Sequence, residues 1–563
     1  MSENLDSNRF TKGQPQLSDQ RHLTAGLLSL SDALHSSPPL PVLTASAMRE
    51  ADRESIEDLK IPGFILMECA GKAAARRAMG MLPTDRTGRV FICCGKGNNG
   101  GDGIVLARFL ALFGHRVDVW LSHHPSSFGE DALAHWHLFE RLLPENAGAD
   151  ANIRVVDSAR PDGDVDLIVD ALFGTGLRSS VRSPIDEVIR GLNAHPAPIL
   201  ALDMPSGLQA DTGEGMQPCI VAAATVTMGA LKAGMLLGDG PDVCGSVHVA
   251  DIGIPAVVLA RAAQHAGCAR RSSDPWVAER IRPRTRADHK YTTGPALIAG
   301  GSEAFPGAPA LAARGAARAG SGYVIALCPS EIRTILQEKL DAIPVSSWSH
   351  LDNASADELI DLLGDRWSKA KALLVGPGLG QQEDMGSFVW HLLERFDGPA
   401  VIDADGISSL ALLPRIAQEF AERSKGRWIL TPHDGEFRRL LHASAEAESL
   451  TEGNRIETAR AFAARWNCVL LLKGLPSCCA SPDGDVLVNA TGNSAVGTAG
   501  TGDVLAGIET GLLAQGLSPF DAAACGIHLG GTAADDFVEE GAPQSMVAPD
   551  ILDLLPTVLN RFI

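Results

Sequence analysis

Short apolar runs alternate with stretches of helical periodicity over the first half of the chain. Four of these runs predict buried strands: RVFICC (89–94), RVDVWL (116–121), VDLIVD (165–170) and PILALD (198–203). Helical stretches precede the strands or lie between them, near residues 45–60, 64–80, 102–113, 130–143 and 184–193. Strands that alternate with helices predict a parallel sheet that is covered by helices on both faces.

The second half repeats this alternation with an unrelated sequence. Its predicted strands are ALIAG (296–300), YVIAL (323–327), ALLVG (372–376), AVID (400–403), WILT (428–431) and CVLLL (468–472), and the rest of the chain is mostly helical. A polar, arginine-rich segment broken by prolines, residues 269–290, separates the halves. We therefore predict the α/β class with two doubly wound domains, residues 41–272 and 273–563. A partly disordered extension, residues 1–40, precedes them; residues 1–24 are expected to be disordered and the rest is ambiguous.

Composition narrows the class of protein. A chain of 563 residues with 45% hydrophobic and 21% charged residues is expected to form two or more globular cores. No apolar run is long enough to span a membrane, and the polar N-terminus lacks the apolar core of a signal peptide. The net charge of −20 disfavours binding to nucleic-acid phosphates. Eleven scattered cysteines without a C-x-x-C pair favour reduced, buried thiols and a cytoplasmic location.

Three predicted strands of the first half end in residues that suit a ligand site. Strand 89–94 runs into GKGNNGGDG, strand 165–170 ends in Asp170 before ALFGTGL, and strand 198–203 ends in Asp203 before MPSGL. Ligands of open parallel sheets bind beyond the carboxyl ends of the strands, so we expect a pocket there. Glycines and helix N-termini favour a bound anion. Asp170, Asp203 and Ser206 offer oxygens for a cation or for acid–base chemistry.

An ordinary dinucleotide site is the alternative for this region. Gly95-x-Gly97-x-x-Gly100, with Asp118 about 20 residues further on, fits the NAD fingerprint. However, two helical segments precede this strand, whereas the fingerprint normally follows the first strand of its domain. The carboxylates at the other strand ends would also be superfluous for cofactor docking. Each of Asp170 and Asp203 alone could be a helix cap, but together they favour a functional role.

The motifs NNGGDG, VDALFGTGL and DMPSGL resemble the N-terminal domain of the YjeF family, the NAD(P)H-hydrate epimerases. The similarity begins near Thr44, includes MREADRESIEDLKIPGFILMECAG, and ends near Ile254. It implies a Rossmann-like fold that binds NAD(P)HX, in which the reduced nicotinamide is hydrated at C6, and that interconverts the R and S epimers. Cys69 stands where the family commonly has asparagine.

The same resemblance implies the site residues of the first half. A potassium ion would be held by Asn99, Asp170 and Ser206. Asp170 would be catalytic, and whether it transfers protons or only binds the ion stays open. Substrate contacts would come from Asn98, Asn99, Gly100, Gly101, Asp102, Gly174, Thr175, Gly176, Leu177, Arg178, Ser179, Ser180 and Asp203.

The strongest local signal of the second half is NATGNSAVGTAGTGDVLAGIETGLLAQG, residues 489–516. Its glycine-rich start opens a predicted helix, so backbone N–H groups and the helix dipole form an anion site. Asp503 in Gly500-Thr501-Gly502-Asp503 is placed to act as a base on a hydroxyl near that anion, although an isolated aspartate there could simply cap the helix. No Walker A sequence is present, which disfavours a P-loop ATPase.

This G-T-G-D resembles the ribokinase-like superfamily, in which the aspartate is the catalytic base. HKYTTGPALIAGGSEAFPGAPALAARGAARAGSGYV, LLVGPGLG, VIDADGI and LTPHDGEF narrow the resemblance to the ADP-dependent NAD(P)H-hydrate dehydratases, over about residues 274–563. It implies contacts to the hydrate from Ala308, Gly378, His433 and Asp503. It implies contacts to the adenine nucleotide from Lys473, Gly474, Leu475, Pro476, Ser477 and Gly502.

Some positions depart from that pattern. The family's K-G-A-G-T is here Lys473 to Ser477 with Pro476, which lacks an N–H to offer a nucleotide. Tyr291 and Phe305 also replace the usual glycine and tyrosine. Asp403 and Asp405 are interpreted only as caps of the loop after their strand.

Together the two resemblances imply a bifunctional metabolite-repair enzyme whose first half makes the epimer that its second half consumes. Dehydration would use ADP or ATP and release AMP and phosphate. The implied cofactors are potassium in the first domain and magnesium with the nucleotide in the second. We expect NADHX and NADPHX as substrates, a homo-oligomer such as a tetramer or larger assembly, and no membrane or nucleic-acid partner.

Two other functions stay open at this point. One is a kinase of the hydroxymethylpyrimidine or hydroxyethylthiazole type with a fused nucleotide-binding regulatory domain. The other is a non-enzymatic binding module, as in RNA-decapping scaffolds that use the first fold. The sequence does not decide between NADHX and NADPHX, or between ADP and ATP.

Overall fold

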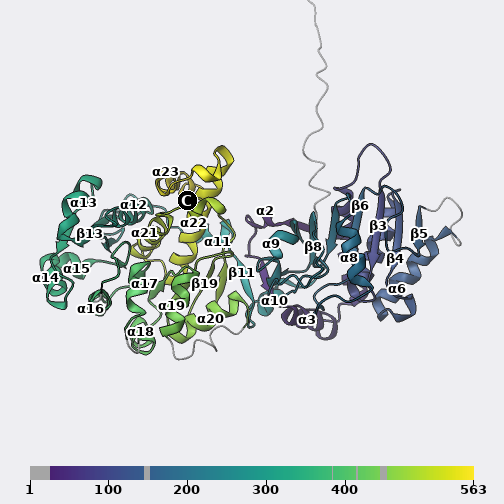
Figure 1. Ribbon diagram of the computed structural model, residues 1–563, viewed down its shortest axis with the longest axis horizontal. Helices are drawn as coiled ribbons and strands as arrows, with labels where there is room; N and C mark the ends of the chain where they lie inside the picture. Colours follow the sequence, from purple (N-terminus) through teal and green to yellow (C-terminus); the bar gives the residue numbers. More distant parts are fainter. Residues whose placement is uncertain (1–25, 145–151, 383, 414–415, 444–452) are drawn as a thin grey trace, which may run out of the picture.

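The computed structural model describes residues 26–144, 152–382, 384–413, 416–443 and 453–563. The disorder predicted for residues 1–24 falls outside these ranges. Two α/β lobes lie side by side, the first half of the chain in purple and blue and the second in green and yellow (Figure 1). The predicted fold class, two doubly wound domains, is confirmed.

The first lobe is built on an eight-stranded sheet in the order β1-β10-β8-β7-β6-β3-β4-β5. All neighbouring strands pair parallel except β1, which is antiparallel to β10. The four predicted strands correspond to β3, β4, β6 and β7. The bounds are β1 Leu27–Ser29, β3 Arg89–Cys94, β4 Arg116–Leu121, β5 Ile153–Val156, β6 Leu167–Ala171, β7 Ile199–Leu202, β8 Ala224–Met228 and β10 Ser246–Ala250.

Helices cover both faces of this sheet. One core contains the side chains of α3, α4, α5 and α6, and a smaller core on the other face contains those of α8. The bounds are α2 Leu30–Ala33, α3 Ala45–Arg53, the π-helical turn η1 Glu54–Asp58, α4 Gly63–Met79, α5 Asn98–Leu112, α6 Glu130–Phe139, α8 Ile185–Asn193, α9 Gly240–Val243 and α10 Ala256–Ala262.

The second lobe contains a twelve-stranded sheet, β14-β13-β12-β15-β16-β17-β18-β19-β20-β11-β2-β9. Strands β14 to β18 are parallel, and β19 and β20 follow as antiparallel neighbours. All six predicted strands of this half are present. The bounds are β12 Pro295–Ala299, β13 Tyr323–Pro329, β14 Val345–Trp348, β15 Ala372–Val375, β16 Ala400–Ile402, β17 Trp428–Leu430, β18 Val469–Leu472, β19 Cys478–Ala480 and β20 Val486–Val488.

Alternate residues along each strand of this sheet enter two different cores. Leu297 belongs to the core with α14, α16, α18 and α20, whereas Ile298 belongs to the core with α12, α21, α22 and α23. The bounds are α11 Asp274–Ala278, α12 Ala308–Arg318, α13 Arg333–Lys339, α14 Asn353–Leu363, α15 Asp365–Lys369, α16 Met385–Arg395, α17 Asp405–Leu410, α18 Ile416–Ser424, α19 Asp434–Ala443, α20 Arg455–Trp466, α21 Thr501–Ala514, α22 Pro519–Glu540 and α23 Ala548–Leu559.

Three short strands of the first half belong to the sheet of the second. Strand β11 (Ala269–Arg271) pairs parallel with β20, β2 (Pro41–Leu43) pairs antiparallel with β11, and β9 (Leu231–Lys232) pairs parallel with β2. The polar segment that the sequence suggested as a connection therefore contributes a strand to the sheet. The boundary near residue 273 stays a prediction, but it crosses continuous backbone hydrogen bonding rather than a free linker.

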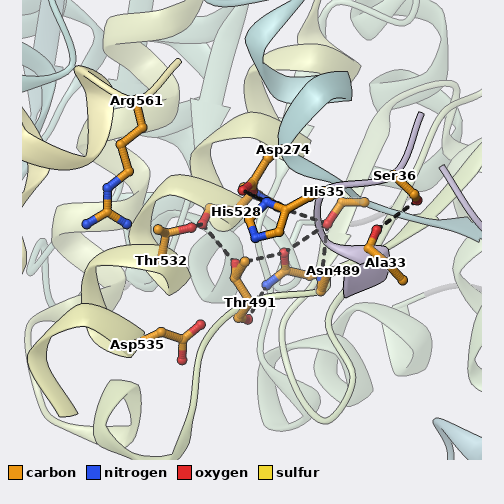
Figure 2. Close-up of polar contacts among 12 residues, drawn as sticks. Ala33, His35, Ser36, Asp274, Asn489, Thr491, His528, Thr532, Asp535 and Arg561 are labelled. Carbon is orange, nitrogen blue, oxygen red and sulfur yellow. Dashed lines mark hydrogen bonds and ion pairs between the residues drawn. The ribbon is translucent and has the colours of Figure 1, made fainter. Parts of the chain in front are cut away.

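Side chains at this junction bind the connecting segment to α22 (Figure 2). Fully buried His528 of α22 contacts Ser272 Oγ with Nδ1 at 3.0 Å and Asp274 Oδ1 with Nε2 at 2.9 Å. His35 Nδ1 lies 2.8 Å from the other oxygen of Asp274, and the Asp274 N–H donates to Leu34 O. The segment before β2 is thereby held against both lobes.

All eleven cysteines are unpaired, and all but Cys69 are buried, which confirms the predicted thiols. Among the described helices, none combines the length and the apolar character needed to cross a membrane.

Close packing of α12 on α21 fixes the helix that begins at the G-T-G-D motif. A Cβ on Gly507 would lie 2.1 Å from Ala312 O, and one on Gly315 would lie 2.6 Å from Val504 O. The two backbones therefore touch, and only glycine fits at these positions.

We predict that Gly507→Ala lowers the stability of the second lobe by about 1–3 kcal/mol, because the added methyl group forces the two helices apart. Gly530→Ala in α22 is the matched control, since a Cβ there meets nothing within 4 Å. Thermal unfolding of both variants gives the comparison. A melting temperature of Gly507→Ala at or above that of the wild type would contradict the packing argument.

Candidate functional site

A cavity of about 720 Å³ lies beyond the carboxyl ends of the strands in the first lobe. The loops after β3, β4, β6 and β7 contribute to its lining, as do residues of α3 and α4. This is the position that the strand-end argument predicted for a ligand.

Most predicted residues of this half line the cavity. They are Asn98, Asn99, Asp102, Gly174, Thr175, Gly176, Leu177, Arg178, Ser179 and Asp203. Asn98 and Asn99 begin α5, and Gly174 lies against the carboxylate of Asp203, which would be 2.7 Å from an added Cβ. The structure thus brings three separate motifs together around one space.

Other predicted residues lie outside the lining. A Cβ on Gly100 would be 1.9 Å from Gly95 O, and one on Gly101 would be 2.6 Å from the sulfur of Met67. These two glycines therefore permit close packing at the start of α5. Ser180 is exposed at the surface.

Asp170 lies behind the cavity and is completely buried. Its carboxylate accepts hydrogen bonds from Ser206 N at 2.7 Å, Ser206 Oγ at 2.6 Å and Leu172 N at 3.2 Å. Burial raises the pKa of Asp170 to about 6 although these hydrogen bonds oppose the shift. Buried Asn99 has no hydrogen-bond partner for either polar atom of its side chain among the described residues.

Asp203 and Lys232 form the main ion pair of the cavity. Lys232 Nζ lies 2.6 Å from Asp203 Oδ1, 2.9 Å from Thr227 Oγ1 and 2.8 Å from Met228 O, and only 1% of the residue is exposed. Asp203 adopts a left-handed φ of 61°, which is strained for a residue other than glycine and often marks a functional site. Sequence reasoning missed Lys232, although a single lysine within the apolar stretch TVTMGALKAGM is a signal.

Two further carboxyls share this environment. Burial and the nearby Asp203 raise the pKa of Asp102 well above its usual range. Burial also raises the pKa of Asp52 to about 6, with Lys232 opposing and Asp203 reinforcing the shift. Asp52 comes from α3 and was not among the predicted site residues.

The alternative NAD site would use Asp118 to bind a ribose. Asp118 lies within β4 and is paired with Arg89 at 3.2 Å and with Arg154. Although burial opposes ionisation, the two guanidinium groups lower the pKa of this carboxyl below its usual value. Its charge is therefore already used in structural ion pairs.

The second candidate site surrounds the N-terminus of α21. Gly500, with a φ of 91°, precedes the helix, and Asp503 lies in its first turn. A Cβ on Gly502 would lie 3.7 Å from Lys473 Nζ and 3.9 Å from Asp403 Oδ2. Lys473 Nζ and Asp403 Oδ1 are 2.8 Å apart.

These charges control the protonation of Asp503. Burial and the neighbouring carboxylate of Asp403 raise the pKa of Asp503 to about 7, while Lys473 opposes the shift. Burial alone would lower the pKa of Lys473, but Asp403 and Glu436 outweigh it and raise the pKa. Asp403 was interpreted from the sequence as a loop cap; its position at a strand end, like that of Asp203, was the available signal.

The predicted hydrate-contacting residues cluster on either side of this group. His433 forms a backbone bridge with Lys473, and its N–H donates to Glu436 Oε2 at 2.9 Å. Ala308 begins α12, and its Cβ would be 2.9 Å from a Cβ on Gly378. Phe305 lies at the same contact and is exposed.

The loop from Lys473 to Ser477 is held from behind by Arg455. This guanidinium donates to Lys473 O at 2.7 Å and to Pro476 O at 3.0 Å, and pairs with Asp434 at 2.6 Å. Gly474 N donates to Ser477 Oγ, and Leu475 is 92% exposed. The residues of this loop that differ from the family's K-G-A-G-T are therefore still held in place by hydrogen bonds.

Comparisons with known proteins agree over both lobes. Residues 63–234 match the family described as "YjeF-related protein N-terminus", and residues 296–557 match the family described as "NAD(P)H-hydrate dehydratase". The chain is 42% identical to a bifunctional NAD(P)H-hydrate repair enzyme of Salinibacter ruber, over 94% of this chain and 98% of that protein. It is 35% identical to the enzyme of that name from Escherichia coli, over 93% and 95% of the two chains.

Among solved structures, an ADP/ATP-dependent NAD(P)H-hydrate dehydratase from Bacillus subtilis, co-crystallised with ATP and Mg²⁺, is 30% identical. The match covers 52% of this chain and 98% of the Bacillus subtilis chain, with a TM-score of 0.42.

We predict that Lys232→Met destabilises the first lobe by about 3–5 kcal/mol, because it leaves Asp203 and two other acceptors without their buried donor. Lys60→Met is the control, since Lys60 is exposed in the same lobe. Chemical denaturation of both variants measures the difference. Equal midpoints for Lys232→Met and Lys60→Met would show that the ion pair contributes nothing to folding.

Proposed function

The chain belongs to the family of bifunctional NAD(P)H-hydrate repair enzymes, and from this membership we propose how its residues carry out the two reactions. The first lobe is the NAD(P)H-hydrate epimerase domain, and the second is the NAD(P)H-hydrate dehydratase domain. A kinase with a regulatory domain is not favoured, because relatives that match nearly the full length are repair enzymes.

The hydrated nucleotide binds in the 720 Å³ cavity of the first lobe. The N-terminus of α5, with Asn98 and Asn99, receives its phosphates, because free N–H groups at a helix start attract anions. Gly174 to Ser179 and Asp203 contact the rest of the substrate. The observation that supports this arrangement is the convergence of all three motifs on one cavity.

A potassium ion fits beside Asp170, with Asn99, Asp170 and Ser206 as ligands. Asn99 has a buried side-chain oxygen without a partner among the described residues, and the other two residues add a carboxylate and a hydroxyl. Such a set of oxygens with a single carboxylate suits a large monovalent cation better than zinc or magnesium. The ion would hold three loops together, and Asp170 serves as its ligand rather than as the acid–base residue, because it does not line the cavity.

Dehydration takes place at the N-terminus of α21. Asp503 removes the proton of the hydrate's hydroxyl group as the hydroxyl oxygen attacks the terminal phosphorus of the nucleotide. The new phosphate ester then breaks at its C6–O bond and C5 loses a proton, so that phosphate leaves and the C5=C6 double bond of NAD(P)H is restored. With ADP the other product is AMP. The observation that carries this proposal is Asp503 in the first turn of a glycine-preceded helix beside the Lys473–Asp403 pair.

The nucleotide occupies the loop from Lys473 to Ser477 together with Gly502, and magnesium accompanies it. Lys473 neutralises phosphate charge, while Pro476 offers no N–H and Gly474 supplies the close approach. Ala308, Gly378 and His433 contact the hydrate on the other side. A homo-oligomer and a cytoplasmic location remain predictions.

We predict that Asp503→Asn lowers the dehydration rate by about 10²–10⁴-fold, because the amide keeps the shape of the side chain but cannot accept a proton. The rate is measured from the absorbance of NAD(P)H after S-hydrate and ADP are added. Asp550→Asn, at the first turn of α23, is the control for a capping carboxylate. Near-normal turnover by Asp503→Asn would remove Asp503 from the mechanism.

The same residue sets the pH dependence of dehydration. A base must be ionised to accept a proton, and the pKa of Asp503 is about 7. The rate constant kcat/KM should therefore rise with pH through about 7 and reach a plateau above it. A rate that does not change across this range would argue against Asp503 as the base.

We predict that epimerisation depends on potassium concentration and that Ser206→Ala shifts this dependence to higher concentrations, because one ion ligand is lost. The interconversion of purified R and S hydrate is followed without nucleotide, in potassium chloride against a choline chloride background. Ser122→Ala, another hydroxyl that lines the cavity, should retain the wild-type potassium curve. If potassium affects neither the wild type nor Ser206→Ala, the ion site is wrong.

A further inference from the structure

Asp52 differs from the acidic residues around it. It lies in the last turn of α3, directly before the π-helical turn η1, and lines the cavity of the first lobe. The carboxylates next to it in the sequence are all paired with arginines: Glu50, Glu57 and Asp58 with Arg53, and Glu54 with Arg261. Among the residues that the structure describes, no hydrogen bond or ion pair holds the Asp52 carboxyl. Turns of the π type are rare in proteins, and those that occur often lie at functional sites.

Burial disfavours the charged form of the Asp52 carboxyl and brings its proton exchange closer to neutral pH than that of an ordinary aspartate. Burial raises its pKa to about 6. Four charged groups lie nearest to Asp52: Arg49 on α3, Asp102 on α5, Asp203 after β7 and Lys232 in β9. Arg261 of α10 and His265 of the turn after it lie behind α3. The other titratable groups of the cavity lining are Lys96, His123, Asp131 and Arg178.

A second carboxyl of different character lines the same cavity. Asp203 is held by Lys232 at 2.6 Å, and its other oxygen accepts a hydrogen bond from Thr175 N at 3.3 Å. The cavity therefore holds two carboxyls in different settings, Asp52 without a partner and Asp203 fixed by Lys232, and an acid–base pair needs two such groups on one cavity.

We propose that Asp52 and Asp203 are the two proton-transferring groups of the epimerase, with Lys232 as the residue that positions Asp203. This inference rests on the proposed epimerase site and assigns its chemistry to residues other than Asp170. Asp52 belongs to MREADRESIEDLK, within the segment that resembles the epimerase family, although it precedes residues 63–234 that match the family described above.

The reaction balances with one proton on the pair. Protonated Asp52 donates to the C6 hydroxyl, the C6–O bond breaks, and water leaves while the lone pair of the ring nitrogen forms a C=N bond. Water then adds to C6 from the opposite face, the electron pair returns to the nitrogen, and the released proton goes to Asp203. The reverse reaction uses Asp203 as the acid and Asp52 as the base.

The test uses the full-length chain, one purified epimer and no nucleotide, with the two epimers separated by chromatography. Asp52→Asn should slow interconversion by about 10²–10⁴-fold, the usual effect of losing an acid–base residue. Asp52→Glu should recover part of the rate. Asp58→Asn, an exposed aspartate six residues on, is the matched control and should leave the rate unchanged. Asp203→Asn should also be slow, and asparagine tolerates the left-handed backbone there.

Two further measurements distinguish a failure of the Asp52 proposal from a misfolded variant and from a failure of the proposed epimerase function. Dehydration of S-hydrate with ADP should be normal in Asp52→Asn, which shows that the second lobe is intact, and a thermal unfolding curve like that of Asp58→Asn would show that the first lobe is folded. The pair works with one shared proton, and this proton is lost as pH rises past about 6. The wild-type rates of the R-to-S and the S-to-R reactions should therefore both fall above this pH. Interconversion by Asp52→Asn at the wild-type rate, or a wild-type rate that does not fall near this pH, would overturn the proposal. A wild-type chain that does not interconvert the epimers at all would instead refute the proposed epimerase function.

Discussion

Both lobes depend on an aspartate–lysine pair, with one buried and one half-buried member, at the carboxyl ends of parallel strands. Asp203 follows β7 and pairs with Lys232 of β9, and Asp403 follows β16 and pairs with Lys473 after β18. Isolated charges are costly to bury, so each pair is tolerated only because both members are present and hydrogen-bonded. Each pair then sets the electrostatic field of its site.

The consequence of these pairs is a division of roles among nearby carboxyls. Asp52 and Asp102 in the first lobe and Asp503 in the second have raised pKa values, since burial and the paired aspartate both disfavour a second negative charge. A protein can in this way keep one carboxyl protonated and another ionised within a single pocket. The same physical arrangement serves two different reactions on two unrelated sequences.

The two lobes are joined by backbone hydrogen bonds as well as by a chain connection. Strand β9 carries Lys232 and pairs with β2, which pairs with β11, which pairs with β20 of the dehydratase lobe. Asn454, the cap of α20, donates to Asp211 O in the epimerase lobe, and the next residue, Arg455, holds the loop from Lys473 to Ser477. The positions of the two sites are therefore fixed relative to one shared sheet.

Local pattern was sufficient for the architecture and for much of each site. Apolar runs of strand length alternate with helical stretches, which predicted the fold class. Motifs at strand ends meet at one edge because parallel strands all point the same way, and most of the residues predicted from these motifs do line the first cavity. The local pattern did not identify Asp52, Lys232 and Asp403 as site residues. A single lysine in an apolar strand, or an aspartate at the end of a helix, gives no local sign of its partner, since the partner comes from a distant part of the chain. Likewise, only the folded chain reveals that Asp170 lies behind the cavity and that residues 269–271 form a strand of the shared sheet, because burial and long-range strand pairing are properties of tertiary packing.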